Sequence, residues 1–76
     1  MFHTEQAREQ VAAEIRAQMG RLKISGKDLA ESTGVAPATL SRKLNAKAGF
    51  TVEELVKIAR VLGVPAATFF GGVDAA

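Results

Sequence analysis

The chain contains no cysteine and a single histidine. Without cysteine it cannot use the disulfides that stabilise many small secreted domains, and one histidine is too few for an ordinary structural zinc site. The longest apolar run, residues 61–73, is interrupted by Gly63 and Pro65, whereas a membrane-spanning helix needs about 20 apolar residues. The N-terminus turns polar after Met1 and Phe2. We therefore expect no structural metal, no membrane segment and no targeting sequence.

A length of 76 residues and a mass of 8.0 kDa predict one domain over residues 1–76. Apolar residues make up 47% of the chain, but 14 of them are alanines, which leaves 22 larger side chains for a core. A chain of this size buries only about 60% of the surface that it exposes when unfolded. Since no segment alternates apolar and polar residues as a strand would, we expect a compact all-α fold.

Helical spacing of apolar residues is evident over residues 4–20 and just beyond. The residues that recur every three or four positions there are Val11, Ile15, Met19 and Leu22. Thr4 is a suitable N-cap for this helix. The opposite face is charged and is expected to be solvated; it carries Glu5, Arg8, Glu9 and Arg16.

Another helix is predicted to begin at Thr51. Thr51 and Glu54 are spaced as in a capping box, in which each side chain binds the backbone N–H of the other residue. The predicted apolar face of this helix consists of Val52, Leu55, Val56, Ala59 and Leu62, and Gly63 ends it. A final short helix follows over residues 66–70. Phe50 and Phe69, on either side of this region, are expected to enter the core.

Residues 27–44 have the pattern of a helix-turn-helix. Two short helices joined by a tight turn need a small residue where they cross, a glycine in the turn and apolar residues that hold the second helix on the first. Ala30 and Gly34, four positions apart, supply the small residue and the glycine. The apolar residues are Leu29, Val35 and Leu40. This pattern predicts a helix-turn-helix over about residues 26–45.

The segments KDLAESTGVAPATLSRKL (27–44) and ELVKIARVLGVPAATFF (54–70) resemble those of the Cro/C1-type helix-turn-helix regulators of bacteria and their phages. The resemblance extends over about residues 15–70 and implies a five-helix bundle whose third helix enters the major groove of DNA. The sequence departs from the family pattern in two places. Met19 and Leu44 stand where the family often has a buried Arg–Glu ion pair, and Lys43 stands where it usually has an apolar residue.

The resemblance also implies which residues contact DNA. The exposed part of the third helix faces base edges in this family, and the matching base-contact candidates are Ala36, Pro37, Ala38, Ser41 and Arg42. Arg42 is the strong candidate for bidentate binding of guanine, because alanine and proline offer only apolar contact, for instance with a thymine methyl group. The candidates for phosphate contact are Lys27, Thr39, Lys43, Asn45 and Lys47.

The charge distribution agrees with this assignment. Residues 25–47 carry four cations and two acids (net +2), residues 1–24 carry four and three (+1), and residues 48–76 carry two and three (−1). A basic segment beside a helix N-terminus suits the phosphate backbone of DNA. Taken without the motif, the same cations would be ordinary solvated side chains.

The residue combinations of common enzymes are missing from the sequence. The chain has no cysteine that could act as a nucleophile, and His3 is the only histidine that could act as a base for a serine. No glycine-rich phosphate loop is present either. We therefore expect no catalytic residues, no metal site and no cofactor.

Two functions are compatible with these features. The first is a cytoplasmic, sequence-specific transcriptional regulator, in a bacterial nucleoid or in the host cytoplasm if phage-encoded, that binds double-stranded DNA as a homodimer and represses by occluding a promoter. The second is an antitoxin-type or anti-regulator module whose main partner is a protein. Phe70, with Val64 or Val73, is a candidate dimer contact, although Phe70 is equally compatible with simple cover by a flexible tail at residues 72–76.

Overall fold

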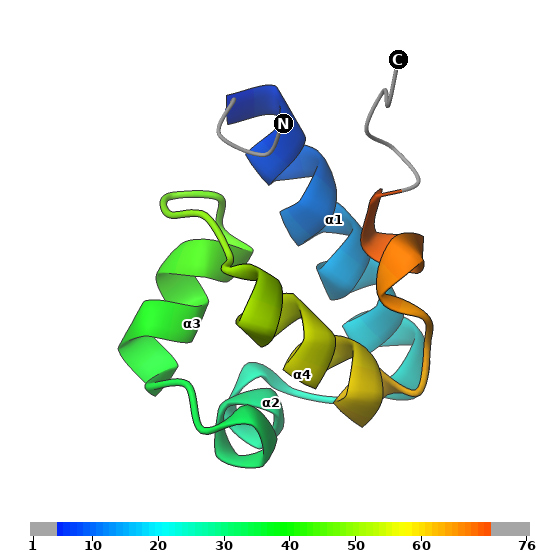
Figure 1. Ribbon diagram of the computed structural model, residues 1–76. Helices are drawn as coiled ribbons and strands as arrows, with labels where there is room; N and C mark the ends of the chain where they lie inside the picture. The colour runs from blue at the N-terminus through cyan, green and yellow to red at the C-terminus, as the bar shows by residue number, and fades with distance from the viewer. Residues whose placement is uncertain (1–4, 71–76) are drawn as a thin grey trace.

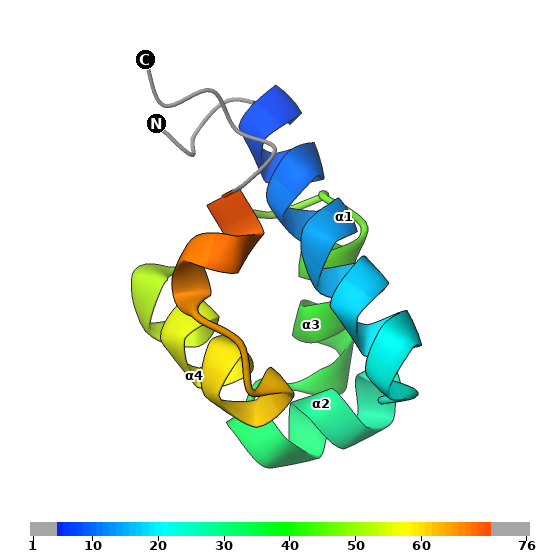
Figure 2. The ribbon, with the colours of Figure 1, turned by 90° about the vertical axis from the view of Figure 1, so that its right-hand side faces the viewer.

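The computed structural model describes residues 5–70, which form an all-α bundle (Figures 1 and 2). The elements are α1 (Glu5–Leu22), α2 (Gly26–Thr33), α3 (Pro37–Leu44), α4 (Val52–Leu62) and a 3₁₀ helix, η1 (Ala66–Phe70). Helix α1 packs on α3, α4 and η1, while α2 packs on α3 and α4. No helix in this part of the chain is long and apolar enough to cross a membrane. The predicted all-α class is confirmed.

Helix α1 buries the predicted stripe of Val11, Ile15 and Met19 in the core. The prediction for Leu22 is wrong, because this side chain is 45% exposed at the last position of the helix. Ile24, two residues later, packs against the core instead. The predicted cap Thr4 lies outside the described residues.

Helix α4 begins with the predicted capping box. The Thr51 hydroxyl accepts the N–H of Glu54 at 3.1 Å, and the Glu54 carboxylate accepts the N–H of Thr51 at 2.8 Å. Leu55, Ala59 and Leu62 are buried as predicted, together with Ile58. The expected burial of two valines is wrong, since the exposed fractions are 73% for Val52 and 42% for Val56. Val52 is the first residue of α4 and Val56 lies one helical turn after it, so both are on a side of the helix that the core does not cover.

The last element, η1, is a 3₁₀ helix and not the fifth α-helix that we predicted. Its five residues form a single short segment, in which the N–H of Thr68 bonds to the carbonyl of Pro65 at 2.9 Å. Such i→i+3 bonding is usual in short helical pieces. Phe69 is fully buried and Phe50 packs partly buried against the same core, so both phenylalanine predictions are confirmed.

Each of the four α-helices is followed by a residue with left-handed backbone conformation. These residues are Lys23 after α1 (φ 57°), Gly34 after α2 (φ 77°), Ala46 after α3 (φ 60°) and Gly63 after α4 (φ 70°). Glycine adopts this conformation at little cost, whereas a Cβ atom makes it unfavourable by about 1–2 kcal/mol. Lys23 and Ala46 therefore hold their helix ends in a strained backbone.

Candidate nucleic-acid interface

The turn between α2 and α3 is built by three consecutive residues. Gly34 has φ 77° and ψ 8°, the left-handed conformation that lets the chain reverse directly after α2. Before it, the buried Thr33 hydroxyl donates to the carbonyl of Leu29 at 2.8 Å and accepts the N–H of Val35 at 3.4 Å. Val35 then packs partly buried against the core. The helix-turn-helix predicted over about residues 26–45 thus corresponds to α2, this turn and α3.

Helix α3 is held to the bundle by its inner side. Leu40 and Leu44 are buried in the common core, which also contains Met19 from α1. The two positions where the family often has an ion pair are therefore both buried and apolar in this chain. Pro37 occupies the first turn of α3, where its missing N–H would have no helical partner.

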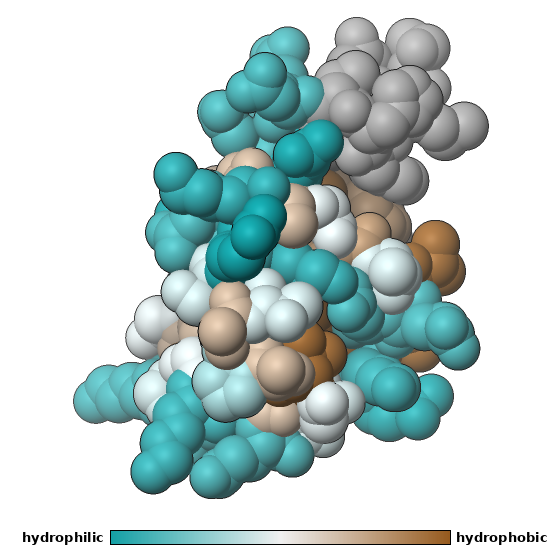
Figure 3. Space-filling model, turned by 90° about the vertical axis from the view of Figure 1, so that its left-hand side faces the viewer, coloured by the Kyte–Doolittle hydropathy of each residue, from teal (hydrophilic) through white to brown (hydrophobic). Residues whose placement is uncertain are grey.

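The outer side of α3 is exposed to solvent. All the predicted base-contact residues are exposed: Ala36, Pro37, Ala38, Ser41 and Arg42. Thr39 is exposed as well. Figure 3 views the side on which α3 lies in Figure 1, and it shows small pale and light-brown side chains in the middle, bordered by teal hydrophilic ones. The centre of this side is therefore less hydrophilic than its border.

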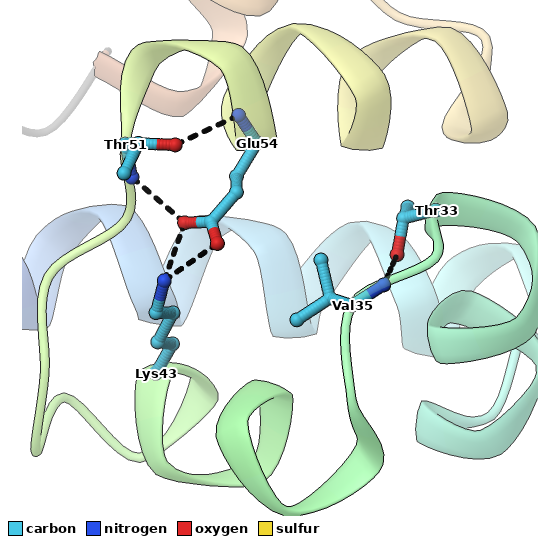
Figure 4. Close-up of polar contacts among 5 residues, drawn as sticks. All are labelled: Thr33, Val35, Lys43, Thr51 and Glu54. Atoms are coloured by element: carbon cyan, nitrogen blue, oxygen red, sulfur yellow. Dashed lines mark hydrogen bonds and ion pairs between the residues drawn. The ribbon is translucent and has the colours of Figure 1, made fainter.

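Lys43, unlike its exposed neighbour Arg42, is directed toward the start of α4. Its ammonium lies 2.6 Å from both carboxylate oxygens of Glu54 (Figure 4), and only 12% and 19% of the two side chains are exposed. Within residues 5–70 this is the single ion pair. Lys43 was predicted to contact phosphate, but its charge is already bound by a carboxylate inside the protein. Lys43 is therefore not among the DNA contacts that we propose.

The pKa of Glu54 is lowered from its ordinary value. Burial is the largest single influence and by itself would raise this pKa, because it disfavours the charged carboxylate. The hydrogen bond and charge of Lys43, together with the hydrogen bonds of Thr51, act in the other direction and outweigh burial. Glu54 is thus an ionised group that both caps α4 and binds the end of α3.

The loop after α3 holds two further phosphate candidates, Asn45 and Lys47. The side-chain amide of Asn45 donates to the carbonyl of Ser41 at 2.8 Å. The backbone N–H of Lys47 donates to the carbonyl of Arg42 at 2.8 Å, across the strained Ala46. The backbone of Lys47 is therefore fixed relative to that of Arg42, and both side chains are exposed.

Two open grooves border α3 and bring most of the predicted contact residues together. One, of about 390 Å³, lies where α1, α2 and α3 meet, and its lining includes Lys27, Pro37, Ser41 and Asn45. The other, of about 740 Å³, lies between α1 and the end of α3, and its lining includes Arg42, Asn45 and Lys47.

Arg16 of α1 lines both grooves, and the sequence analysis missed this role. The sequence placed Arg16 only on a solvated face of the first helix. Its position one turn before Met19 was the available signal, because Met19 shares the core with Leu44 at the end of α3. Arg8, predicted for the same solvated face, is half-buried and lines the larger groove.

The candidate dimer contacts lie elsewhere. Val64 and Phe70 are half-buried and pack against the core, while Val73 and the predicted flexible tail at residues 72–76 lie outside the described residues. Among residues 5–70, no group of three or more His, Cys, Asp or Glu side chains is arranged to hold a metal ion.

Comparison with known proteins agrees with the α2–turn–α3 geometry. A protein-family model described as helix-turn-helix matches residues 13–69, which include the C-terminal part of α1, all of α2, α3 and α4, and most of η1. No curated protein and no solved structure matches the chain. Because the family match extends over most of the sequence, the chain belongs to the helix-turn-helix family of DNA-binding regulators and is of its Cro/C1 type.

Proposed function

We propose that this protein is a sequence-specific transcriptional regulator that inserts α3 into the major groove of double-stranded DNA. The observation that carries the proposal is the two-sided character of α3. Its inner side is attached to the bundle by Leu40, Leu44 and Lys43, while its outer side is exposed to solvent. A helix presented in this way matches the docking geometry of helix-turn-helix proteins.

Arg42 is the principal base-reading residue in this proposal. Its guanidinium is exposed and has no carboxylate partner within residues 5–70, so its donors are available for O6 and N7 of a guanine. Such a contact discriminates against other bases by about 1–3 kcal/mol. Ser41 offers one hydroxyl, and Pro37 and Ala38 offer apolar contact with thymine methyl groups. We therefore expect a short guanine-containing half-site.

The phosphate contacts proposed are Lys27, Thr39, Asn45 and Lys47. All four side chains are exposed and lie on α2, α3 or the loop that follows α3. Each phosphate that a cation neutralises releases counterions and contributes about −0.9 to the slope of log K against log salt concentration. With so few cations per chain, we expect modest affinity for one half-site and a clear salt dependence.

A homodimer would give the affinity that one chain lacks. Two copies would place their α3 helices in successive major grooves about 34 Å apart. The proposed contacts include Val64, Phe70 and Val73. Val64 and Phe70 are half-buried, so part of each residue remains available for such a contact. Sedimentation of the full chain with and without DNA measures dimer formation directly. We further propose that binding acts in the cytoplasm and represses by occluding a promoter, without a cofactor and without catalysis.

The decisive experiment is selection of bound sites from random double-stranded DNA, followed by titration of the selected site and a scrambled one at several salt concentrations. We expect tighter binding of the selected site, a negative salt slope and two half-sites one helical turn apart. Equal affinity for both sequences, or affinity independent of salt, would contradict the proposal. In that case an antitoxin-type or anti-regulator module with a protein partner becomes the better explanation.

A further inference from the structure

We infer that Arg16, on α1 and outside the helix-turn-helix, binds a DNA phosphate on the flank of α3. This inference rests on the proposed DNA-binding function and adds a residue to it. Arg16 lines the groove shared by α1, α2 and α3 as well as the groove between α1 and the end of α3. It is thus the α1 residue that borders the candidate interface on both of these surfaces.

The smaller groove combines an apolar floor with polar edges. Buried Leu40 and Leu44 contribute to its lining, and Arg16 and Lys27 enter it from α1 and α2. Ser41 and Asn45 border it from α3 and the residue after α3. Two cations from different helices therefore converge beside the helix that we propose to read DNA, at the place where a phosphate strand bordering the major groove would pass.

The charge around Arg16 is uncompensated in this groove. No carboxylate belongs to its lining, and Arg16 forms no ion pair within residues 5–70. Glu5 and Glu9 line the larger groove together with Arg16. However, Glu9 is two helical turns away, which is about 10 Å along the helix axis and comparable to the Debye length at physiological salt. The guanidinium is therefore available to an external anion.

A phosphate is a better ligand for Arg16 than a base edge. Arg16 comes from a neighbouring helix and borders α3 near Asn45, beyond the outward-facing positions at the start of α3. A guanidinium can bind two phosphate oxygens in parallel. The Asn45 amide has two N–H donors and gives one to the carbonyl of Ser41, so its second donor can bind the same phosphate.

The test compares Arg16→Ala with Arg60→Ala in the full chain. Arg60 is an exposed arginine on α4 that lines neither groove, so its replacement removes the same charge from another face. Binding of selected and scrambled DNA would be followed by fluorescence anisotropy over a range of salt concentrations, and thermal unfolding would confirm that both variants fold. Alanine suits an exposed position inside a helix.

We expect Arg16→Ala to weaken binding of both DNA sequences by the same factor. The slope of log K against log salt concentration should become shallower by about 0.9, the contribution of one phosphate contact. Arg60→Ala should change neither quantity. Two results would overturn the inference: equal behaviour of the two variants on a protein that still binds selected DNA, or a change of sequence preference in Arg16→Ala. If the unmodified protein shows no salt-dependent DNA binding, the proposed function itself fails, and this outcome is distinct from either of the other two.

Discussion

The ammonium of Lys43 lies 2.6 Å from both carboxylate oxygens of Glu54, and the same carboxylate accepts the backbone N–H of Thr51 at 2.8 Å. One glutamate therefore connects the last turn of α3 with the first turn of α4. The connection spans the loop that carries Asn45 and Lys47. The position of α3 in the bundle thus depends on an ion pair in addition to apolar packing.

Replacing Lys43 should destabilise the fold. We expect Lys43→Met to lower the free energy of unfolding by about 2 kcal/mol, because it leaves the partly buried Glu54 carboxylate without its charged hydrogen-bond donor. Urea denaturation at neutral pH measures this change. Lys57→Met is the matched control, since Lys57 is exposed and has no ion-pair partner within residues 5–70. Equal stability of the two variants would show that the pair contributes nothing.

Stability should decrease in acid partly through Glu54. Since the folded-state pKa of Glu54 is lowered, its contribution is fully present above the pKa of an unfolded glutamate and is lost as the pH falls through the folded-state pKa. Glu54→Gln can still cap α4, because glutamine also completes a capping box, but it does not titrate. Urea midpoints measured from neutral to acidic pH should therefore fall less steeply in Glu54→Gln than in the unmodified protein. Parallel curves would contradict this assignment.

The strained loop residue Ala46 offers a stabilising substitution. With φ at 60°, Ala46 occupies a backbone conformation that glycine adopts without steric cost, and we expect Ala46→Gly to raise stability by about 1 kcal/mol. The reverse change, Gly63→Ala, serves as the control: a Cβ there meets no atom within 4 Å, so only the backbone strain at φ 70° acts. Thermal unfolding should move in opposite directions for the two variants.

Arg42 and Lys47 should affect DNA binding in different ways. We expect Arg42→Ala to reduce the preference for the selected site by about 1–3 kcal/mol, because it removes the proposed guanine contact. Lys47→Ala should weaken binding of selected and scrambled DNA alike and reduce the salt slope. Anisotropy titrations on both sequences measure the two effects. An unchanged preference in Arg42→Ala would remove Arg42 from the base-reading residues.

Much of the fold follows from local patterns. The capping box of α4, the turn at Gly34 and the buried stripe of α4 depend on residues close together in the chain, so their spacing is visible in the sequence. The exposure of Val56 was not visible in this way, because a valine at the edge of a helical stripe is buried only if a neighbouring element covers it. The strain at Ala46 was hidden for a related reason, since glycine is the usual residue there.

The candidate interface was predictable in its centre and less so at its margins. The exposure of the outer side of α3 followed from the resemblance, but the charges around it depend on tertiary contacts. Lys43 and Arg42 are neighbours in the sequence, yet one is bound by Glu54 and the other is exposed. Arg16 is remote from the motif in sequence and borders it in space. Counting cations along the chain could not separate these three residues.

The separation of α3 into an anchored and an exposed side has a consequence for protein engineering. Leu40, Leu44 and the Lys43–Glu54 pair hold the helix in place, and none of these residues is proposed to touch DNA. The outward positions, Ala38, Ser41 and Arg42, can therefore be randomised together in a library without disturbing the attachment of the helix. The protein would then serve as a small scaffold from which variants that bind other operator sequences can be selected.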